Sequence, residues 1–230
     1  YSTNRRTFIR HIFWKLHYLS TQLLQEKRKV HPMLKRVLSK DVQLTRTFLS
    51  KAKDITIFRS LKVHQKLLEI SCHGIVWLVC VVGSIWLLGN EDLYQLQMNL
   101  LMALILDIIC IAFLKALTRR RRPSPTNDIG PDKFSFPSGH ASRAAMLVYI
   151  FVYVNPLPII CIPPLLAWLV TVAVSRVVAE KHFLLDIFGG LGIGFFEGLV
   201  MSILWLSRDS SNYLVSWLSD EKLVGGDYHV

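Results

Sequence analysis

Two histidines and an aspartate stand at spacings that suit the transfer of a phosphoryl group. His182 and Asp186 are four residues apart, so on a helix they share one face. There the carboxylate can hold one imidazole nitrogen while the other nitrogen points outward, which makes His182 a candidate nucleophile. His140 is the second histidine, and we expect it to protonate the departing oxygen.

The same blocks contain the groups that a bound phosphate needs. A phosphoryl group in transfer carries negative charge on its equatorial oxygens, so proteins catalyse its transfer mainly with donors aimed at those oxygens. Lys115, Arg122 and Arg176 supply positive charge. Ser138 and Gly139 precede an apolar run of helical character, so they present a hydroxyl and an N–H at a helix N-terminus, where anions bind readily. We predict that these five residues bind phosphate.

The three blocks resemble the signature of the type-2 phosphatidate phosphatase (lipid phosphate phosphatase) family. They are Lys115 with Arg122-Pro123, then Pro137-Ser138-Gly139-His140, then Ser175-Arg176 with His182 and Asp186. The similar region runs from about residue 66 to residue 206. Within it, the stretches 67–77, 98–123 and 132–145 are similar to the presqualene and polyisoprenoid diphosphate phosphatase branch.

This resemblance implies a two-step hydrolysis through a phosphohistidine, without a metal or another cofactor. By the resemblance, His182 is the nucleophile, Asp186 orients it, and His140 acts as acid and then as base. The phosphate-binding residues that it implies are Lys115, Arg122, Ser138, Gly139 and Arg176.

The apolar content is concentrated in segments that suit a membrane. Four of them are close to the roughly 20 residues that cross a hydrocarbon core, and a fifth is shorter: 70–88, 96–117, 159–178, 183–206 and 141–154. The four cysteines all lie inside apolar segments without a Cys-x-x-Cys pair, so neither disulfides nor a zinc site is expected. We predict an all-α, polytopic membrane bundle of five to six membrane helices.

The first 66 residues differ from the rest in charge. They hold 16 of the 27 Lys and Arg but only three acids, which favours the cytosolic side of a membrane. Apolar residues recur at roughly helical spacing over 8–23, as in a helix lying in the membrane interface; a solvated basic helix packed on the core is the alternative. We divide the chain into a basic amphipathic region (1–66), a membrane phosphatase core (67–206) and a C-terminal tail (207–230).

Membrane topology follows from the same bias. With the N-terminus in the cytosol, the first span exits near Asn90, a connector without Lys or Arg, and the second returns at Arg119 to Arg122. The alternation places the three blocks on one side of the membrane, which we expect to be cytosolic, in the endoplasmic reticulum or nuclear envelope.

The basic run after the second span has two interpretations, a stop-transfer cluster or part of the site. Positions 115, 119 and 122 fall on one helical face, and we expect Pro123 to end the helix where the phosphate should sit. On that basis Arg119 assists the site, while Arg120 and Arg121 meet lipid or water.

Other residues inside the spans are expected to have structural roles. Asp107 and Glu197 lie within apolar segments, where a charge is expensive and is paired or protonated. Gly190, Gly194 and Gly198 continue the four-residue step from His182 and Asp186, and small residues at this step let helices approach closely.

Taken together, the sequence predicts a membrane phosphohydrolase for isoprenoid diphosphates, isoprenoid monophosphates or related lipid phosphates. Its partners would be the bilayer and the lipid substrate, without nucleic acid, and a homo-oligomer is left open. The alternatives are a phosphatidate or sphingoid phosphate phosphatase, a lipid phosphotransferase, and a membrane interaction protein that works through its basic N-terminal arm.

Overall fold

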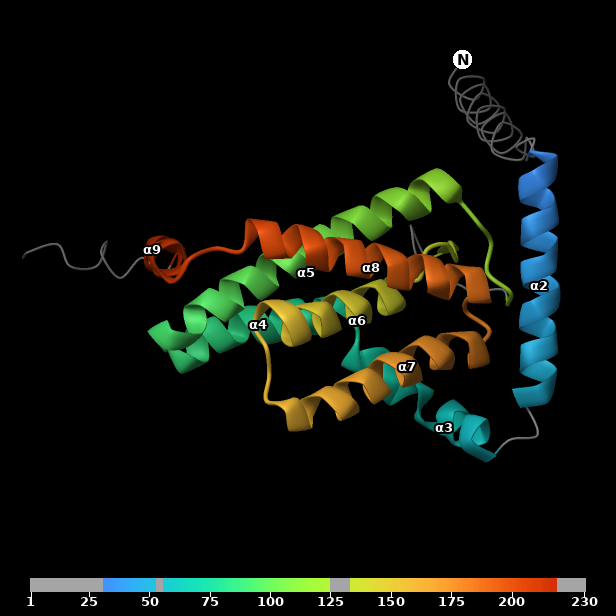
Figure 1. Ribbon diagram of the computed structural model, residues 1–230, viewed down its shortest axis with the longest axis horizontal. Helices are drawn as coiled ribbons and strands as arrows, with labels where there is room; N and C mark the ends of the chain where they lie inside the picture. Colours follow the sequence, from blue (N-terminus) through green and yellow to red (C-terminus); the bar gives the residue numbers. More distant parts are fainter. Residues whose placement is uncertain (1–30, 53–55, 125–132, 219–230) are drawn as a thin grey trace, which may run out of the picture. The chain divides into compact units, whose positions relative to one another are not determined.

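The computed structural model describes residues 31–52, 56–124 and 133–218. In this part of the chain the regular elements are helices (Figure 1). They are α2 (Pro32–Ala52), α3 (Thr56–Ser71), α4 (Gly74–Leu88), α5 (Glu91–Thr118), α6 (Gly139–Tyr149) with a π-helical extension η2 (Ile150–Val154), a 3₁₀ turn η3 (Ile159–Cys161), α7 (Ile162–Val178), α8 (Leu184–Leu204) and α9 (Arg208–Leu218). The all-α prediction is confirmed.

The chain divides into two compact units, Tyr1–Lys40 and Asp41–Val230. Of the first unit the structure describes residues 31–40, which begin α2 and are mostly exposed. The amphipathic pattern predicted over 8–23 lies outside the described residues. The second unit contains the remaining helices.

Among the residues that the structure describes, three helices are long and apolar enough to cross a membrane: Glu91–Thr118, Ile159–Val178 and Leu184–Leu204. Val63–Ser71 and Gly74–Leu88 make a fourth if this pair, bent by 48°, is one broken span. Gly139–Val154 is apolar but shorter. The five predicted segments therefore all form helices, but only three or four of them have the length of a full span. The 141–154 segment is too short because its helix begins only two residues earlier, and the 70–88 segment is long enough only together with the helix before the bend.

The closest helix packing joins α6 to α8, and α6 also contacts α5 and α7. Glycines on α8 make this approach possible. A Cβ on Gly194 would overlap the Ser142 carbonyl, and one on Gly190 or Gly198 would crowd Ser138 or Tyr149. The packing role predicted for these glycines is confirmed, and it fixes the start of α8 beside the start of α6.

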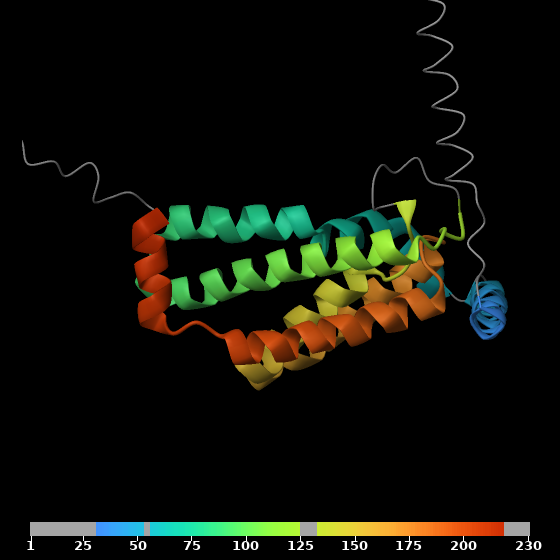
Figure 2. The ribbon, with the colours of Figure 1, turned by 90° about the horizontal axis from the view of Figure 1, so that it is seen from above.

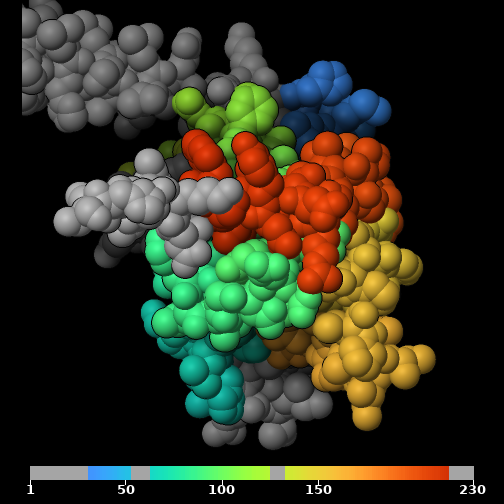
Figure 3. All heavy atoms as spheres, turned by 90° about the vertical axis from the view of Figure 1, so that its left-hand side faces the viewer, coloured from blue at the N-terminus to red at the C-terminus, as the bar shows by residue number. Residues whose placement is uncertain are grey.

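α4 and α5 lie side by side (Figure 2), and α9 packs against α5 (Figure 3). Asn99 on α5 clips the chain entering α9, because its side chain accepts from the N–H of Leu206 at 2.8 Å and donates to the carbonyl of Leu206 at 3.2 Å. Arg208 also pairs with Asp92 at the start of α5. The region predicted as a tail thus contains a helix held on the bundle, and α3 runs across the predicted boundary at 66.

α5 ends earlier than the sequence predicted. Its last residue is Thr118, and Arg119 adopts the left-handed conformation (φ 50°) with its N–H on the carbonyl of Lys115. The expectation that the helix continues to Pro123 was therefore wrong. An arginine seldom takes this conformation, so the sequence carries no signal for the stop. As a result Arg122 reaches the bundle from a loop rather than from the helical face of Lys115.

A buried ionic cluster joins α5, α6 and α8 inside the bundle. Arg143 pairs with Asp107 at 2.5 Å and donates to the carbonyl of Cys72 at 2.9 Å. Glu197 accepts from the hydroxyl of Ser142 at 3.1 Å. Asp107 is fully buried and Glu197 nearly so, which agrees with the structural role predicted for both.

Candidate active site

At one end of the bundle, elements distant in sequence surround a cavity of about 420 Å³. The cavity is lined by the last turn of α3, the first turn of α4 and the second half of α5. The start of α6, the end of α7 and the loop between α7 and α8 complete the lining. The lining residues are Glu69, His73, Gly74, Ile75, Ile108, Ile111, Ala112, Lys115, Arg122, Gly139, His140, Arg143, Arg176, Lys181 and His182. Six of the eight predicted site residues are among them. The other two, Ser138 and Asp186, do not line the cavity.

His182 is buried in the loop between α7 and α8. Its Nδ1 lies 2.7 Å from the carbonyl oxygen of Ser135, which can only accept, so Nδ1 carries the proton and Nε2 keeps its lone pair. Burial, together with the positive charges of Arg122 and Lys115, lowers the pKa of His182 well below that of an ordinary histidine. The side chain is thus neutral at neutral pH, as a nitrogen nucleophile requires.

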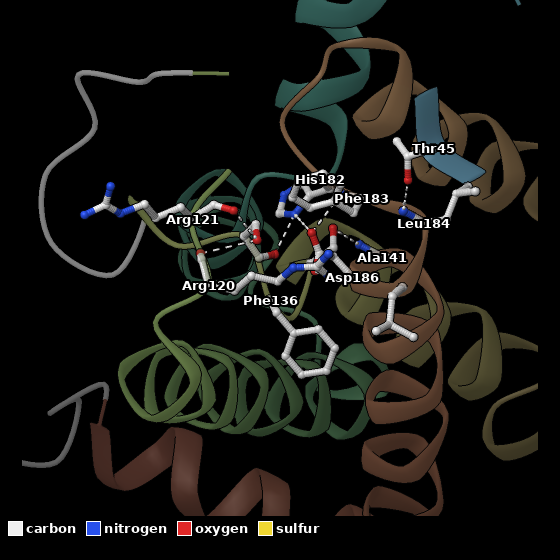
Figure 4. Close-up of polar contacts among 12 residues, drawn as sticks. Thr45, Arg120, Arg121, Phe136, Ala141, His182, Phe183, Leu184 and Asp186 are labelled. Atoms are coloured by element: carbon white, nitrogen blue, oxygen red, sulfur yellow. Dashed lines mark hydrogen bonds and ion pairs between the residues drawn. The ribbon is translucent and has the colours of Figure 1, made fainter. Parts of the chain in front are cut away.

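Asp186 is less direct in its contact with the imidazole than the sequence suggested. Its Oδ2 lies 3.9 Å from Nδ1 of His182, beyond a hydrogen bond, and accepts instead from the N–H of Phe183 at 2.8 Å. His182, Phe183 and Asp186 lie together at the start of α8 (Figure 4). The carboxylate therefore folds the loop that carries His182, and Ser135 makes the direct hydrogen bond.

Arg120 corrects another expectation. Its side chain is mostly buried and pairs with Asp186 at 2.7 Å and with Asp41 at 2.5 Å, with its guanidinium over the ring of Phe183. It does not meet lipid or water. Asp41 in turn accepts from the N–H of Leu185 at 2.9 Å, so this network satisfies the first turn of α8 and anchors the loop of His182.

Thr45 completes this support. Its hydroxyl oxygen accepts from the N–H of Leu184 at 3.1 Å (Figure 4). Residues of α2 therefore hold the start of the helix that follows the candidate nucleophile. Sequence reasoning missed Asp41, Thr45 and Arg120 because no spacing rule relates residues that are 66 to 144 positions apart.

His140 is half-buried in the first turn of α6. Its Nε2 lies 3.3 Å from the carbonyl oxygen of Glu69, an acceptor, so this contact requires a proton on Nε2. The ring also lies edge-on to His73, with 6.4 Å between the centroids. The protonated nitrogen faces Glu69 in the cavity wall formed by α3. Burial, together with the charges of Arg176 and Arg143, lowers the pKa of His140 to about 3, so an acid role requires the negative charge of a bound phosphate.

The predicted phosphate-binding cations surround the cavity from three elements. Lys115 comes from the last turn of α5, Arg122 from the following loop, and Arg176 from the last turn of α7. Arg119, by contrast, is exposed and folds back onto the carbonyl of Ala116. It does not line the cavity, so the expectation that it assists the site was wrong.

Ser138 and Gly139 were both predicted to bind phosphate, but their positions differ. Ser138 is fully buried as the N-cap of α6, where its hydroxyl accepts from Ala141 and its N–H donates to the carbonyl of Asp186 at 3.0 Å. Gly139 is the one that borders the cavity. Ser138 thus ties the start of α6 to the start of α8, and Gly139 stands at the helix N-terminus where an anion would be stabilised.

Four charged or titratable residues of the lining were not predicted: Glu69, His73, Arg143 and Lys181. Lys181 stands beside His182 in sequence, which is a weak signal. Glu69 lies where the basic N-terminal region gives way to the first apolar segment. No neighbouring residue in the sequence indicates that Glu69 lies at this site. Among the described residues, no three His, Cys, Asp or Glu side chains are grouped so that they could hold a metal ion.

Among known families, the PAP2 superfamily matches residues 96–209, just under half of the chain. This stretch contains all eight predicted site residues, and the superfamily supports the prediction of a membrane phosphatase.

Two solved structures share the fold of this chain. The chain resembles the transmembrane PAP2-type phosphatidylglycerolphosphate phosphatase of Bacillus subtilis with a TM-score of 0.55 and 20% identity, over 84% of this chain and 94% of that one. It also resembles LpxE of Aquifex aeolicus with a TM-score of 0.50 and 19% identity, over 70% of this chain and 93% of that one. The polytopic membrane fold predicted from sequence is confirmed.

Proposed function

We propose that this protein hydrolyses a phosphate or diphosphate of a membrane lipid through a phosphohistidine on His182. One observation carries the proposal: the imidazole of His182, neutral and with its Nδ1–H on Ser135, borders the same cavity as His140 and the cations Lys115, Arg122 and Arg176. The PAP2 superfamily match over residues 96–209 supports it.

The first chemical step uses Nε2 of His182 as the nucleophile. Its lone pair forms a bond to phosphorus while the bond from phosphorus to the leaving oxygen breaks. His140, which enters this step as an imidazolium favoured by the charge of the bound phosphate, donates a proton to that oxygen. Lys115, Arg122 and Arg176 neutralise the charge on the phosphoryl oxygens, and the N-terminus of α6 at Gly139 adds its dipole.

The second step releases the enzyme. His140, now neutral, takes a proton from a water molecule, and the resulting oxygen nucleophile attacks phosphorus as the bond to Nε2 breaks. Inorganic phosphate leaves, and both histidines return to their starting protonation. Cationic side chains supply the charge stabilisation in both steps, so we propose that no metal is needed.

For the substrate we propose isoprenoid diphosphates or monophosphates first, with phosphatidate and sphingoid phosphates as alternatives. A similar fold in a phosphatidylglycerolphosphate phosphatase supports the wider class of lipid phosphates. The apolar wall of the cavity, formed by Ile108, Ile111 and Ala112 of α5 with Ile75 of α4, suits the first atoms of a lipid tail. We further propose a site facing the cytosol in the endoplasmic reticulum or nuclear envelope.

The test is phosphate release in detergent micelles containing EDTA, from farnesyl diphosphate, farnesyl monophosphate and phosphatidate. We expect release by the parent protein, and a loss of at least about 10³-fold in His182→Ala. Product analysis with an added lipid alcohol separates hydrolysis from phosphotransfer. Release that survives in His182→Ala would contradict the histidine mechanism, and inhibition by EDTA would contradict metal independence. If the parent releases no phosphate from any of these lipids, the membrane interaction protein becomes the better explanation.

A further inference from the structure

Glu69 places a carboxylate on the cations of the phosphate site. Its Oε1 lies 2.8 Å from Nζ of Lys181, and its Oε2 lies 3.6 Å from Nη1 of Arg176. Both cations border the cavity together with His182 and His140. A carboxylate and a phosphate compete for the same donors, because both are oxyanions with the geometry that guanidinium and ammonium groups bind.

Arg176 is incompletely satisfied in this arrangement. Only 1% of its side chain is exposed, and two of its nitrogens donate to the carbonyl of Gln65 at 3.2 Å and to the hydroxyl of Ser175 at 3.3 Å. Within the described part of the chain Nη1 has no hydrogen-bond partner, since 3.6 Å to Glu69 is too long. A buried donor without an acceptor costs free energy, which an oxygen of a bound phosphate would recover.

The backbone of the same residue holds His140. The Glu69 carbonyl oxygen is the acceptor that faces Nε2 of His140 at 3.3 Å. Glu69 therefore makes two contacts at the site. Its side chain contacts the cations Arg176 and Lys181, and its backbone carbonyl contacts His140, the proposed acid. Both contacts use donors that the proposed mechanism assigns to the substrate.

The position of Glu69 in the fold allows a phosphate to displace its carboxylate. It lies in the last turn of α3, and the chain breaks and bends by 48° between Ser71 and Gly74. Its side chain is 25% exposed, so the carboxylate can be hydrated when it leaves the cations. Displacement by a phosphate thus requires no unfolding of α4 or α7.

We propose that Glu69 is a specificity-determining residue that competes with substrate phosphate for Arg176 and Lys181. This inference rests on the proposed function. The repulsion between the carboxylate and a ligand grows with the charge of the ligand. A diphosphate, which carries more charge than a monoester, is therefore penalised more strongly, and Glu69 lowers the preference of this site for diphosphates relative to monoesters.

The experiment compares Glu69→Gln with Glu180→Gln in the full chain, in detergent micelles at fixed ionic strength. Glu180 is exposed and adjacent to Lys181, so its substitution removes the same charge near the site without touching the proposed contact. Binding of inorganic phosphate is measured by calorimetry, which needs no turnover. The KM values for farnesyl monophosphate and farnesyl diphosphate are then compared.

We expect Glu69→Gln to tighten the binding of inorganic phosphate by roughly three- to tenfold, the size of one partly screened charge contact. Its KM should fall for both lipids, and further for the diphosphate than for the monophosphate. Glu180→Gln should change each value by less than about twofold. Should Glu69→Gln fail to fold, Glu69→Asp retracts the carboxylate by one methylene and should shift the same values in the same direction.

Unchanged or weaker phosphate binding in Glu69→Gln would overturn the inference, because Glu69 would then only hold Arg176 in place. An equal change in both KM values would overturn the discrimination between diphosphate and monoester. Failure of the proposed function looks different: phosphate would bind, and more tightly in Glu69→Gln, while the parent turned over none of the lipids. Absence of phosphate binding in the parent and in Glu69→Gln would also overturn the inference.

Discussion

Two ionic clusters in this bundle use the same side-chain types with opposite balances of charge. Inside the bundle, Arg143 faces Asp107, and Glu197 lies nearby on Ser142, so acids outnumber the cation. Around the cavity the cations outnumber the one carboxylate, Glu69. Among the described residues, therefore, the interior cluster has a surplus of acids, whereas the cavity lining has a surplus of cations, which favours an anion.

The two clusters also differ in solvent exposure. Asp107 is fully buried and its partner Arg143 nearly so, while Glu69 and Lys181 are 25% and 32% exposed. A charge buried without its partner is far more costly than one that can turn to water. We therefore expect the buried cluster to control stability and the cavity cluster to control binding.

The largest effect should come from Arg143→Met. It leaves Asp107 buried without its cation, which should lower the free energy of unfolding by about 3–5 kcal/mol. The double variant Arg143→Met/Asp107→Leu should recover most of that loss. Chemical unfolding in mixed micelles, followed by circular dichroism, measures both.

Lys181→Met is the matched control at the cavity. Its partly exposed pair with Glu69 should contribute less than about 1 kcal/mol. Equal losses of stability in Arg143→Met and Lys181→Met would show that the two clusters do not differ in the way proposed.

A smaller effect, on rate, is expected from Asp186→Asn. The carboxylate folds the loop of His182 through Phe183 and Arg120, so its loss should misorient the imidazole. We expect kcat to fall by about tenfold to a hundredfold, as for other groups that orient a reacting histidine, with KM for the monophosphate little changed. Steady-state kinetics in micelles measure the two constants.

Asp41→Asn is the comparison for Asp186→Asn. Asp41 also pairs with Arg120, but its other contact is the N–H of Leu185 rather than the loop of His182. Its substitution should reduce kcat by less than about threefold, in line with loss of one pair in a shared network. If Asp41→Asn slows turnover as much as Asp186→Asn, the effect comes from the network of Arg120 and not from the orientation of His182.

The smallest expected change is in the titration of His182. Because burial and the charges of Arg122 and Lys115 lower its pKa, the ring should remain neutral as the pH falls through about 6.5, where an ordinary histidine gains its proton. Nitrogen-15 NMR of histidine-labelled protein should show the tautomer with its proton on Nδ1, assigned by difference from His182→Ala. A midpoint at or above about 6.5 would contradict this prediction.

The sequence predicted the site well where chemistry is local. His182, His140, Lys115, Arg122 and Arg176 border one cavity, because each block lies at the end of an apolar helix and successive helices alternate between the two ends of a bundle. The glycine contacts of α8 were equally readable, since a four-residue step on a helix gives one continuous face.

The sequence was less informative where a backbone turn or a distant partner decides. The left-handed Arg119 ended α5 four residues before Pro123 and moved Arg122 onto a loop. Arg120 was expected at the membrane surface but lies between Asp41 and Asp186. Neither outcome has a local signature, because both depend on groups that only folding brings near.

By itself, then, the amino-acid sequence determined the helical membrane fold and the set of residues proposed to move a phosphoryl group, since length, apolar periodicity and motif spacing are properties of the chain alone. Only the tertiary structure decided that the carbonyl of Ser135, rather than Asp186, accepts the hydrogen bond from Nδ1 of His182, and that Glu69 pairs with Lys181. These contacts join residues 47 and 112 positions apart. Their distances depend on how the helices pack, and helix packing is set by the whole core rather than by any one segment.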